Sequence, residues 1–196
     1  MISQNVFAAV RQDFSFSYVI AGAEGSINDA SLCAQAFARS FHIPGGRYSV
    51  ADAGFRYRDD MVLPFPNVRY HLQDWCNAEV PPETKKELYN LRHARLRVVV
   101  EQAFGILKRR FKIVRNVGAE YDIDTQIDIV YIVTALHNFI IFRGEEPRFE
   151  CPIGVNSSAS SQRAERVVTG RTSRQIRYTA AEALWEDYQS YLNRSD

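Results

Sequence analysis

Apolar and polar residues follow a strand-like pattern at the start of the chain. Two runs, residues 5–10 and 14–20, are rich in strand-forming side chains, and the second alternates apolar and polar positions from Phe14 to Tyr18. Alternation of this kind is typical of a half-buried strand. Because only three residues separate the runs, the pattern predicts a β-hairpin.

Helical spacing replaces this alternation after a cluster of turn-forming residues at 22–29. Residues 30–41 are predicted to form a helix, with Ser26 or Asp29 available as its N-cap. A Pro-Gly-Gly sequence ends the helix, and residues 47–52 form a short candidate strand.

The middle of the chain contains an extended connection followed by a long helix. Prolines punctuate residues 61–82, which predicts little regular structure there. Residues 85–112 are mostly helix formers, with no proline and a single glycine. The apolar residues of this helix that should face a core are Leu88, Leu91, Val98, Val99 and Ile106. On a regular helix, a second side within an arc of roughly 80° carries Asn90, His93, Arg97, Glu101 and Lys108.

Two further helices are predicted in the last third of the chain. One can be capped by Thr125 or Asp124 and runs to about Phe142, and because it is apolar nearly all round it is expected to be buried. The pattern therefore predicts a domain at residues 1–143, a polar and basic linker at 144–179 that is expected to be disordered, and an amphipathic helix at 180–193.

The composition is that of a globular protein, with 46% hydrophobic and 24% charged residues. Three cysteines lie far apart without metal-ligand spacing, and the first residues lack the basic region of a secretory signal. These features indicate an intracellular protein with reduced thiols. No run approaches the roughly 18 apolar residues of a membrane span, so no membrane partner is expected.

Charge is concentrated in the long helix. Residues 85–115 contain ten Lys and Arg residues and two acids, whereas the net charge of the whole chain is only +1. A basic patch on a nearly neutral protein points to a polyanionic partner. Glu101 is a carboxylate among these cations, as a metal and phosphate site would require, although an ordinary exposed helix can look the same.

Asp52 is a second candidate for chemistry. It ends the predicted strand at 47–52 and is followed at once by Ala53-Gly54. Functional carboxylates are common at the carboxyl ends of strands in α/β folds. A plain turn is the alternative, because Asp and Gly are also favoured in turns.

Five motifs occur in an order that resembles one known family: Gly25-Ser-Ile-Asn-Asp29, Tyr48-Ser-Val-Ala-Asp52-Ala-Gly-Phe55, Tyr89-Asn-Leu-Arg-His-Ala-Arg-Leu-Arg97, Glu101-Gln-Ala-Phe-Gly-Ile-Leu-Lys-Arg-Arg-Phe111 and Leu136-His-Asn-Phe-Ile140. Together they are similar to the catalytic domain of Harbinger-type (PIF/Harbinger) DDE transposases and the nuclease-like proteins derived from them. The resemblance covers about residues 2–143.

The resemblance implies an α/β fold of the ribonuclease H-like type, a mixed sheet with flanking helices. It also implies an acidic triad that binds Mg²⁺ or Mn²⁺, in which Asp52 matches the second acid and Glu101 the third. Both are therefore candidate catalytic and metal-binding residues. The side chains expected to contact DNA phosphates beside Glu101 are His93, Arg97 and Lys108, and a more general basic surface would add Arg92, Arg95, Arg109 and Arg110.

One part of the family pattern is missing from this sequence. The family's first acid lies in an Asp-Gly-Thr-His type motif on the first strand, and no such motif occurs here. The expectation is an N-terminally truncated domain without its first strand and with impaired metal-dependent cleavage. Asp29 could replace the missing carboxylate, although its position before a helix also suits an N-cap. His137 is expected to be a buried core histidine rather than a metal ligand.

Three functional hypotheses follow. The first is a metal-dependent DNA endonuclease or transposase domain, impaired by the missing acid. The second is a non-catalytic module, derived from a transposase, that binds DNA or a protein through the basic helix. The third is a fragment without a selected function. The resemblance further implies a nuclear protein and a separate Myb-like DNA-binding partner.

Overall fold

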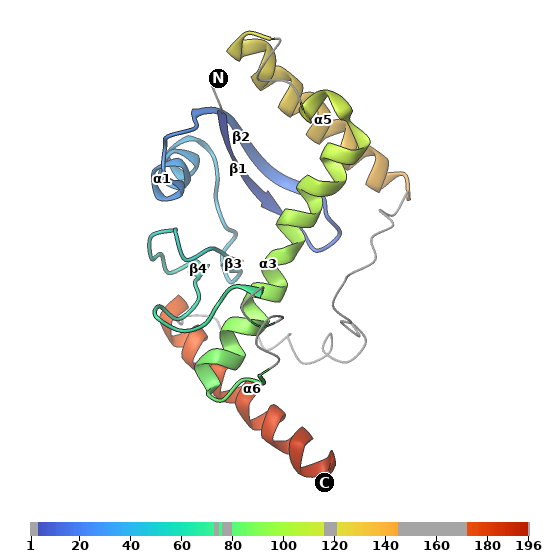
Figure 1. Ribbon diagram of the computed structural model, residues 1–196. Coiled ribbons are helices and arrows are strands. Elements are labelled where there is room, and N and C mark those ends of the chain that lie inside the picture. The colour runs from blue at the N-terminus through green and yellow to red at the C-terminus, as the bar shows by residue number, and fades with distance from the viewer. Residues whose placement is uncertain (1–3, 73–74, 76–79, 116–120, 145–171, 196) are drawn as a thin grey trace. The chain divides into compact units, whose positions relative to one another are not determined.

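The computed structural model describes residues 4–72, 75, 80–115, 121–144 and 172–195 (Figure 1). The chain divides into two compact units. Unit 1 comprises Met1–His42 with Val98–Asn156, and unit 2 comprises Ile43–Arg97 with Ser157–Asp196. Within the described residues the fold is mixed α/β with two two-stranded sheets, one in each unit. These sheets are smaller than the mixed sheet that the family resemblance implies.

Unit 1 begins with the β-hairpin that the sequence pattern predicts. Strands β1 (Gln4–Val10) and β2 (Phe16–Glu24) pair antiparallel, with Ala8 opposite Val19. The Asp13 carboxylate accepts hydrogen bonds from the backbone N–H and the hydroxyl of Ser15, at 2.9 and 2.6 Å, and so stabilises the turn. The hairpin prediction is confirmed, although β2 extends through part of the expected turn region.

Helix α1 (Asp29–Arg39) follows the hairpin, and its N-cap is Asn28. The Asn28 side chain accepts a hydrogen bond from the Ser31 backbone N–H at 2.9 Å, which satisfies one of the free N–H groups of the first turn. The prediction of Ser26 or Asp29 as the cap is therefore wrong. Asp29 is instead the first helical residue, where a carboxylate is favoured by the helix dipole.

Helix α5 (Ile123–Phe142) packs on β2 through polar as well as apolar side chains. The Asn138 amide accepts a hydrogen bond from the Phe16 N–H and donates one to the Phe16 carbonyl, both at 2.8 Å. His137 is fully buried, and its Nε2 lies 3.0 Å from the Phe14 carbonyl oxygen. His137 is thus a buried core histidine as expected, although its buried Nδ1 has no hydrogen-bond partner among the described residues.

The close packing of α5 on β2 also explains why position 22 is a glycine. Gly22 has a φ of +89°, and a Cβ added there would collide with the side chain of Ile127. The core of unit 1 lies between these elements and the second half of helix α3. One cluster of buried residues in this core consists of Phe16, Ala103, Leu107 and Val133.

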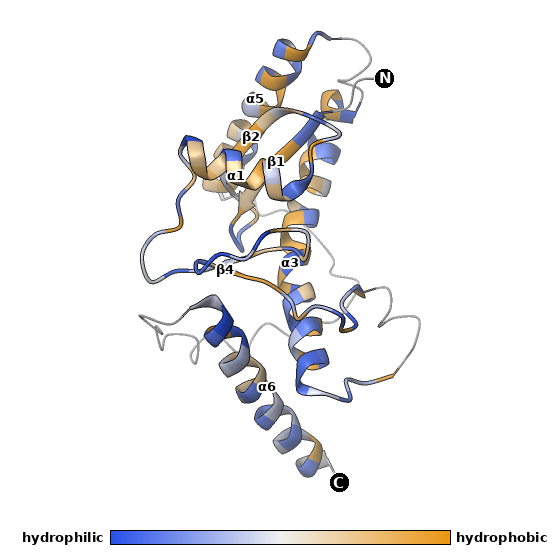
Figure 2. Ribbon diagram, turned by 90° about the vertical axis from the view of Figure 1, so that its left-hand side faces the viewer, coloured by the Kyte–Doolittle hydropathy of each residue, from blue (hydrophilic) through white to orange (hydrophobic). Residues whose placement is uncertain are grey.

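The expectation that α5 is buried is correct for one face of the helix only. Its inner face is buried, whereas its outer face exposes large apolar side chains, including Ile132 and Phe139. Figure 2 shows this helix in the colours of apolar residues along most of its length. By length and composition alone, α5 could cross a membrane, contrary to the expectation that no segment would. Its inner face nevertheless packs in unit 1 as a core helix does.

Unit 2 is built on two short parallel strands and two helices. Strand β3 (Ser49–Val50) pairs with β4 (Met61–Val62), and β4 lies in a segment expected to have little regular structure. Helix α6 (Ser173–Ser195) begins earlier than the predicted helix at 180–193, while residues 145–171 of the predicted linker lie outside the described residues. One cluster of buried residues in unit 2 consists of Val62, Phe65, Tyr89 and Ala181.

Helix α3 (Lys85–Arg110) is the predicted basic helix, and it contributes its first half to unit 2 and its second half to unit 1. Thr84 caps its start, because its hydroxyl accepts a hydrogen bond from the Glu87 N–H at 3.2 Å. At its end, the Arg115 guanidinium donates to the Lys108 carbonyl at 2.9 Å, which satisfies a carbonyl of the last turn.

The Asn138 contact leads to a prediction about stability. We expect Asn138→Leu to lower the free energy of unfolding by about 2–4 kcal/mol, because it leaves the Phe16 N–H and carbonyl without their partners. Urea unfolding followed by circular dichroism measures the change. Asn193→Leu at an exposed position of α6 is the matched control and should change stability by less than about 0.5 kcal/mol. Equal stabilities of the two variants would contradict the proposed contribution of Asn138.

Candidate functional site

Asp52 lies just beyond the carboxyl end of β3, two residues after Val50. Its Oδ1 accepts a hydrogen bond from the Ala53 N–H at 2.8 Å, and its carbonyl accepts one from the Phe55 N–H at 3.1 Å. The strand end and the turn that the sequence offered as alternatives are thus both present. The side chain is 34% exposed, so one edge of the carboxylate reaches solvent.

Arg97 is the cationic partner of Asp52 within unit 2. Its Nη2 lies 3.7 Å from Asp52 Oδ2, and the arginine side chain is only 19% exposed. An ion pair that is partly shielded from water is screened by salt less than a pair that is fully exposed. The sequence pointed to both residues, but it placed Arg97 on DNA phosphates and gave no sign that the two side chains meet.

His93 lies on the same helix as Arg97 but is buried, with 3% of its surface exposed. Its Nε2 lies 3.0 Å from the carbonyl oxygen of Val62 in β4, so the ring nitrogen must carry the proton and donate it. Burial lowers the pKa of His93, which the hydrogen bond to Val62 and the charge of Asp52 partly offset and the charge of Arg97 reinforces. The expected contact of His93 with a DNA phosphate is not compatible with this buried position. The residue instead binds α3 to the strand beside β3.

Asn90 also points into unit 2 rather than to solvent and is fully buried. Its Oδ1 accepts a hydrogen bond from the Phe65 N–H at 2.8 Å, and its Nδ2 lies 3.1 Å from the Phe65 carbonyl and 3.3 Å from that of Val68. These bonds fix the irregular segment that follows β4. A buried amide can replace the strand partner that this segment lacks, a role that residue spacing alone did not indicate.

The remaining cations predicted for DNA binding differ in exposure. Arg92 in unit 2 and Lys108 and Arg109 in unit 1 are exposed. Arg95 and Arg110 are partly buried. The exposed side chains can reach a phosphate group without a change in the fold, so the described structure favours them over the buried positions as contacts for a polyanion.

The other candidate carboxylates, Glu101 on α3 and Asp29 on α1, are both exposed and belong to unit 1, whereas Asp52 belongs to unit 2. The convergence of Asp52 and Glu101 on one cation therefore stays a prediction. Among the residues that the structure describes, no group of three or more His, Cys, Asp or Glu side chains could hold a metal ion. What the structure brings together is Asp52 and Arg97, with His93 close enough to respond to both charges.

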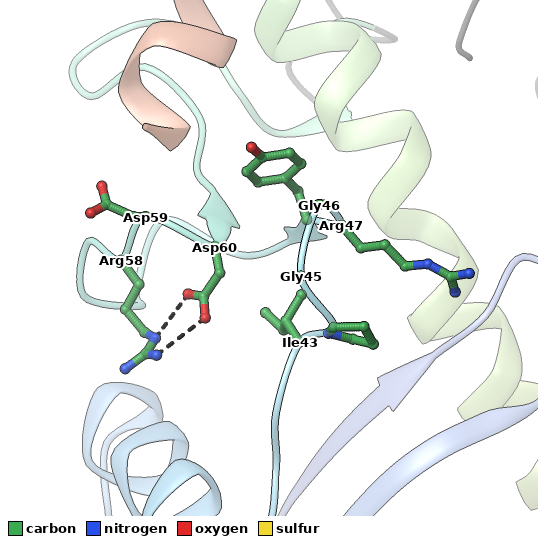
Figure 3. A pocket seen from close by; sticks show the side chains of 9 residues that line it. Ile43, Gly45, Gly46, Arg47, Arg58, Asp59 and Asp60 are labelled. Carbon is green, nitrogen blue, oxygen red and sulfur yellow. Dashed lines mark hydrogen bonds and ion pairs between the residues drawn. The ribbon is translucent and has the colours of Figure 1, made fainter. Parts of the chain in front are cut away.

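A hollow of about 450 Å³ lies elsewhere in unit 2 (Figure 3). It is lined by residues 43–48, which precede β3, and by residues 58–60, which precede β4. Arg58 and Asp60 form a two-point ion pair at its edge, at 3.0 and 3.2 Å. Because β3 and β4 are parallel, the hollow is at their amino ends and Asp52 is at the opposite end. The hollow is therefore not part of the Asp52 site.

An acid after a parallel strand, beside a basic helix, defines an α/β protein with a candidate carboxylate site. The sequence model of a known family, described as DDE superfamily endonuclease, matches residues 2–138. The match covers more than half of the 196 residues, so the chain belongs to the DDE superfamily endonucleases, a family of transposase-related nucleases. Searches of curated proteins and of solved structures returned no match.

The burial of two histidines leads to a prediction about how the free energy of unfolding depends on pH. Burial lowers the pKa of His93 and of His137 below the ordinary value of 6.5. The unfolded chain therefore takes up protons at a higher pH than the folded chain does. The stabilisation is complete above about pH 6.5 and is lost as the pH falls towards the folded-state pKa, by up to about 1.4 kcal/mol per pH unit for each histidine.

Urea unfolding at about pH 7.5 and about pH 5.5 measures this loss. We expect His93→Gln to reduce the loss, because a glutamine amide can donate to the Val62 carbonyl and does not titrate. His42→Gln, at an exposed histidine, is the control and should leave the loss unchanged. If His93→Gln and the unsubstituted chain lose the same stability, burial of His93 is not the cause.

Proposed function

We propose that this chain is a divalent-metal-dependent DNA endonuclease domain of transposase origin, with a ribonuclease H-like fold, in which Asp52 and Glu101 bind the cation. The observation that carries the proposal is the ion pair between Asp52 and Arg97 of α3. Glu101 follows Arg97 by four residues, so the two side chains are neighbours on one side of the same helix. The family match supports the reaction class.

The side chains present suit the proposed cation. Mg²⁺ binds oxygen ligands and is commonly held by one or two carboxylates, with waters and substrate phosphates in the other positions. When bound, the cation would polarise the scissile phosphate and lower the pKa of an attacking water. Asp52 offers Oδ2 on the side that faces Arg97, while Oδ1 is oriented by the Ala53 N–H.

Arg97 has two successive roles in this proposal. Without a cation, its guanidinium neutralises Asp52 and holds the carboxylate in place. With a divalent ion bound to Asp52, the guanidinium would be available to donate to a phosphate oxygen of the substrate.

DNA would lie along the exposed Lys108 and Arg109 of α3. Arg92 is also exposed, but on a regular helix it points about 160° away from Lys108 and would meet a separate phosphate, whereas Arg95, Arg97 and Arg110 are partly buried and would contribute to the field of the surface. Contacts of this kind are made to the phosphates and carry no base specificity. A separate Myb-like partner and a nuclear location, both typical of Harbinger-type proteins, fit such a chain and belong to the same proposal.

A second candidate function is a non-catalytic module that binds DNA or a protein through α3. One observation favours it: among the described residues no cluster of three potential metal ligands occurs. In this case Arg97 would stay paired with Asp52 permanently, and α3 would serve only as a basic surface. Metal binding separates the two functions, and the following experiment measures it.

Calorimetric titration with Mn²⁺ should show binding to the unsubstituted chain and at least tenfold weaker binding to Asp52→Asn and to Glu101→Gln. Arg97→Met removes the competing guanidinium and should bind Mn²⁺ more tightly, by about two- to tenfold. Asp59→Asn, at an exposed carboxylate beside the hollow of unit 2, is the control. Identical, flat titrations of all variants would exclude the endonuclease function and leave the binding module.

The proposed DNA surface is tested by a charge reversal. We expect Lys108→Glu to weaken binding to duplex DNA about tenfold at moderate salt and to reduce the slope of log affinity against log salt by about 1. Arg39→Glu, at an exposed arginine of α1, changes the net charge equally and is the matched control. If both reversals have the same effect, only the net charge matters, and α3 is not the binding face.

A further inference from the structure

The outer face of α5 is a continuous apolar stripe. The exposed residues of the helix recur at helical spacing and run along one side from Asp124 to Arg143, over an arc of roughly 140°. We define the outer stripe as the five large apolar side chains on this face. They are Tyr131, Ile132, Leu136, Phe139 and Phe142, with exposed fractions of 40, 57, 46, 59 and 86%. Exposed apolar surface of this extent marks an interaction site.

The two ends of the outer stripe carry opposite charges. Asp128 lies on the same face one turn before the stripe, and Arg143 follows Phe142 at the C-cap. Between these two residues the helix has no charged side chain in 14 successive positions. The face is therefore negative at one end, neutral and apolar along its length, and positive at the other end. A surface with this pattern is complementary to itself when it is turned end to end.

We propose that the outer stripe is the contact between two copies of this chain, paired through antiparallel α5 helices around a two-fold axis. Such an interface is isologous, so each contact occurs twice. With the axis between Ala135 and Leu136, Asp128 meets Arg143 of the second copy at both ends. Ile132 then meets Phe139 of the second copy. The small side chain of Ala135 lies at the crossing point, where it allows two helices to approach closely.

The surface available is sufficient for a specific dimer. Large apolar side chains of this kind can each bury on the order of 100–200 Å², given their exposed fractions, and the five together offer roughly 600 Å² per copy. Two copies would then bury about 1,200 Å², the lower end of the range for specific interfaces. The pairing needs no change in unit 1, because the inner face of α5 keeps its contacts with β2. It is also independent of the proposed nuclease function.

A lipid surface is the competing occupant, since α5 passes the length and composition test for a membrane span. Crossing a bilayer would require the inner face, with Asn138 and His137, to leave its partners on β2. It would also place Asp128 in or near the apolar layer. The helix is therefore buried on its inner face, and its apolar outer stripe has a charge at each end. These two features fit contact with a second copy better than contact with lipid.

Sedimentation equilibrium of the full chain between about 1 and 200 µM tests the proposal. We expect a monomer–dimer equilibrium, and Leu136→Glu should weaken it at least about thirtyfold by burying a charge in the apolar centre. Leu96→Glu is the matched control, because Leu96 is 52% exposed on α3 and lies outside the stripe; it should change the dissociation constant less than about twofold. Circular dichroism and thermal unfolding establish that both variants are folded.

A charge swap tests the antiparallel register. Asp128→Arg and Arg143→Asp should each weaken the dimer about five- to tenfold, because each places like charges opposite one another twice. The double substitution Asp128→Arg with Arg143→Asp should return the dissociation constant to within about threefold of the original.

Three results would overturn the proposal. One is a chain that stays monomeric throughout the concentration range. Another is a double swap that fails to restore pairing, which would mean that the ends of the stripe do not meet. The third is binding of the monomer to phosphatidylcholine vesicles that Leu136→Glu abolishes and Leu96→Glu does not, which would assign the stripe to lipid.

Discussion

Buried backbone groups need hydrogen-bond partners, and in this chain helical side chains supply many of them. In unit 2 each strand has two residues, so the sheet itself provides few hydrogen bonds. The Asn90 amide and the His93 ring compensate from α3, the first by binding the segment after β4 and the second by binding β4 itself. In unit 1, two side chains of α5 likewise bind backbone groups of the hairpin. Asn138 binds Phe16 at the start of β2, and His137 binds the carbonyl of Phe14 just before it. Removing the Asn90 or the Asn138 amide takes away the side-chain acceptor of a backbone N–H, and a buried N–H without a partner costs more than a lost contact.

This constraint also shapes the candidate site. Because His93 binds β4, and β4 pairs with β3, the first half of α3 lies along the two strands. Arg97, four residues after His93, then reaches the acid that follows β3. The Asp52–Arg97 pair is thus a consequence of how the helix is held against the strands.

Helix α5 shows how one element can have two different partners. Its inner face packs on the hairpin. Hydrogen bonds such as the one from Asn138 to the Phe16 carbonyl hold it there, and the absence of a side chain at Gly22 leaves room for Ile127. Its outer face is as apolar as a core face, yet it ends in charges of opposite sign. A helix that is apolar all round is normally buried all round. Here a second copy of the chain is the simplest way to meet that requirement.

The sequence by itself determined the elements with strong local signals. The hairpin, the basic helix and the helix that ends at Phe142 were all predicted, because alternation, helix propensity and apolar spacing are local properties. Motif order led to the family, which the match to residues 2–138 supports at the level of DDE endonucleases. Asp52 was singled out in the same way, from its place at the end of a predicted strand.

Only the tertiary structure decided which partner each polar side chain has. His93 shares a helical side with Glu101 in sequence terms, yet it is buried against Val62, where its Nε2 is a second donor to a carbonyl that also accepts the Ala51 backbone N–H. Asn28 rather than Asp29 caps α1, a difference of one residue that depends on backbone geometry. Strand β4 could not be predicted, because a two-residue strand has no pattern and exists only through its pairing with β3. Long-range contacts of this kind are set by the whole fold, and no local stretch of sequence encodes them.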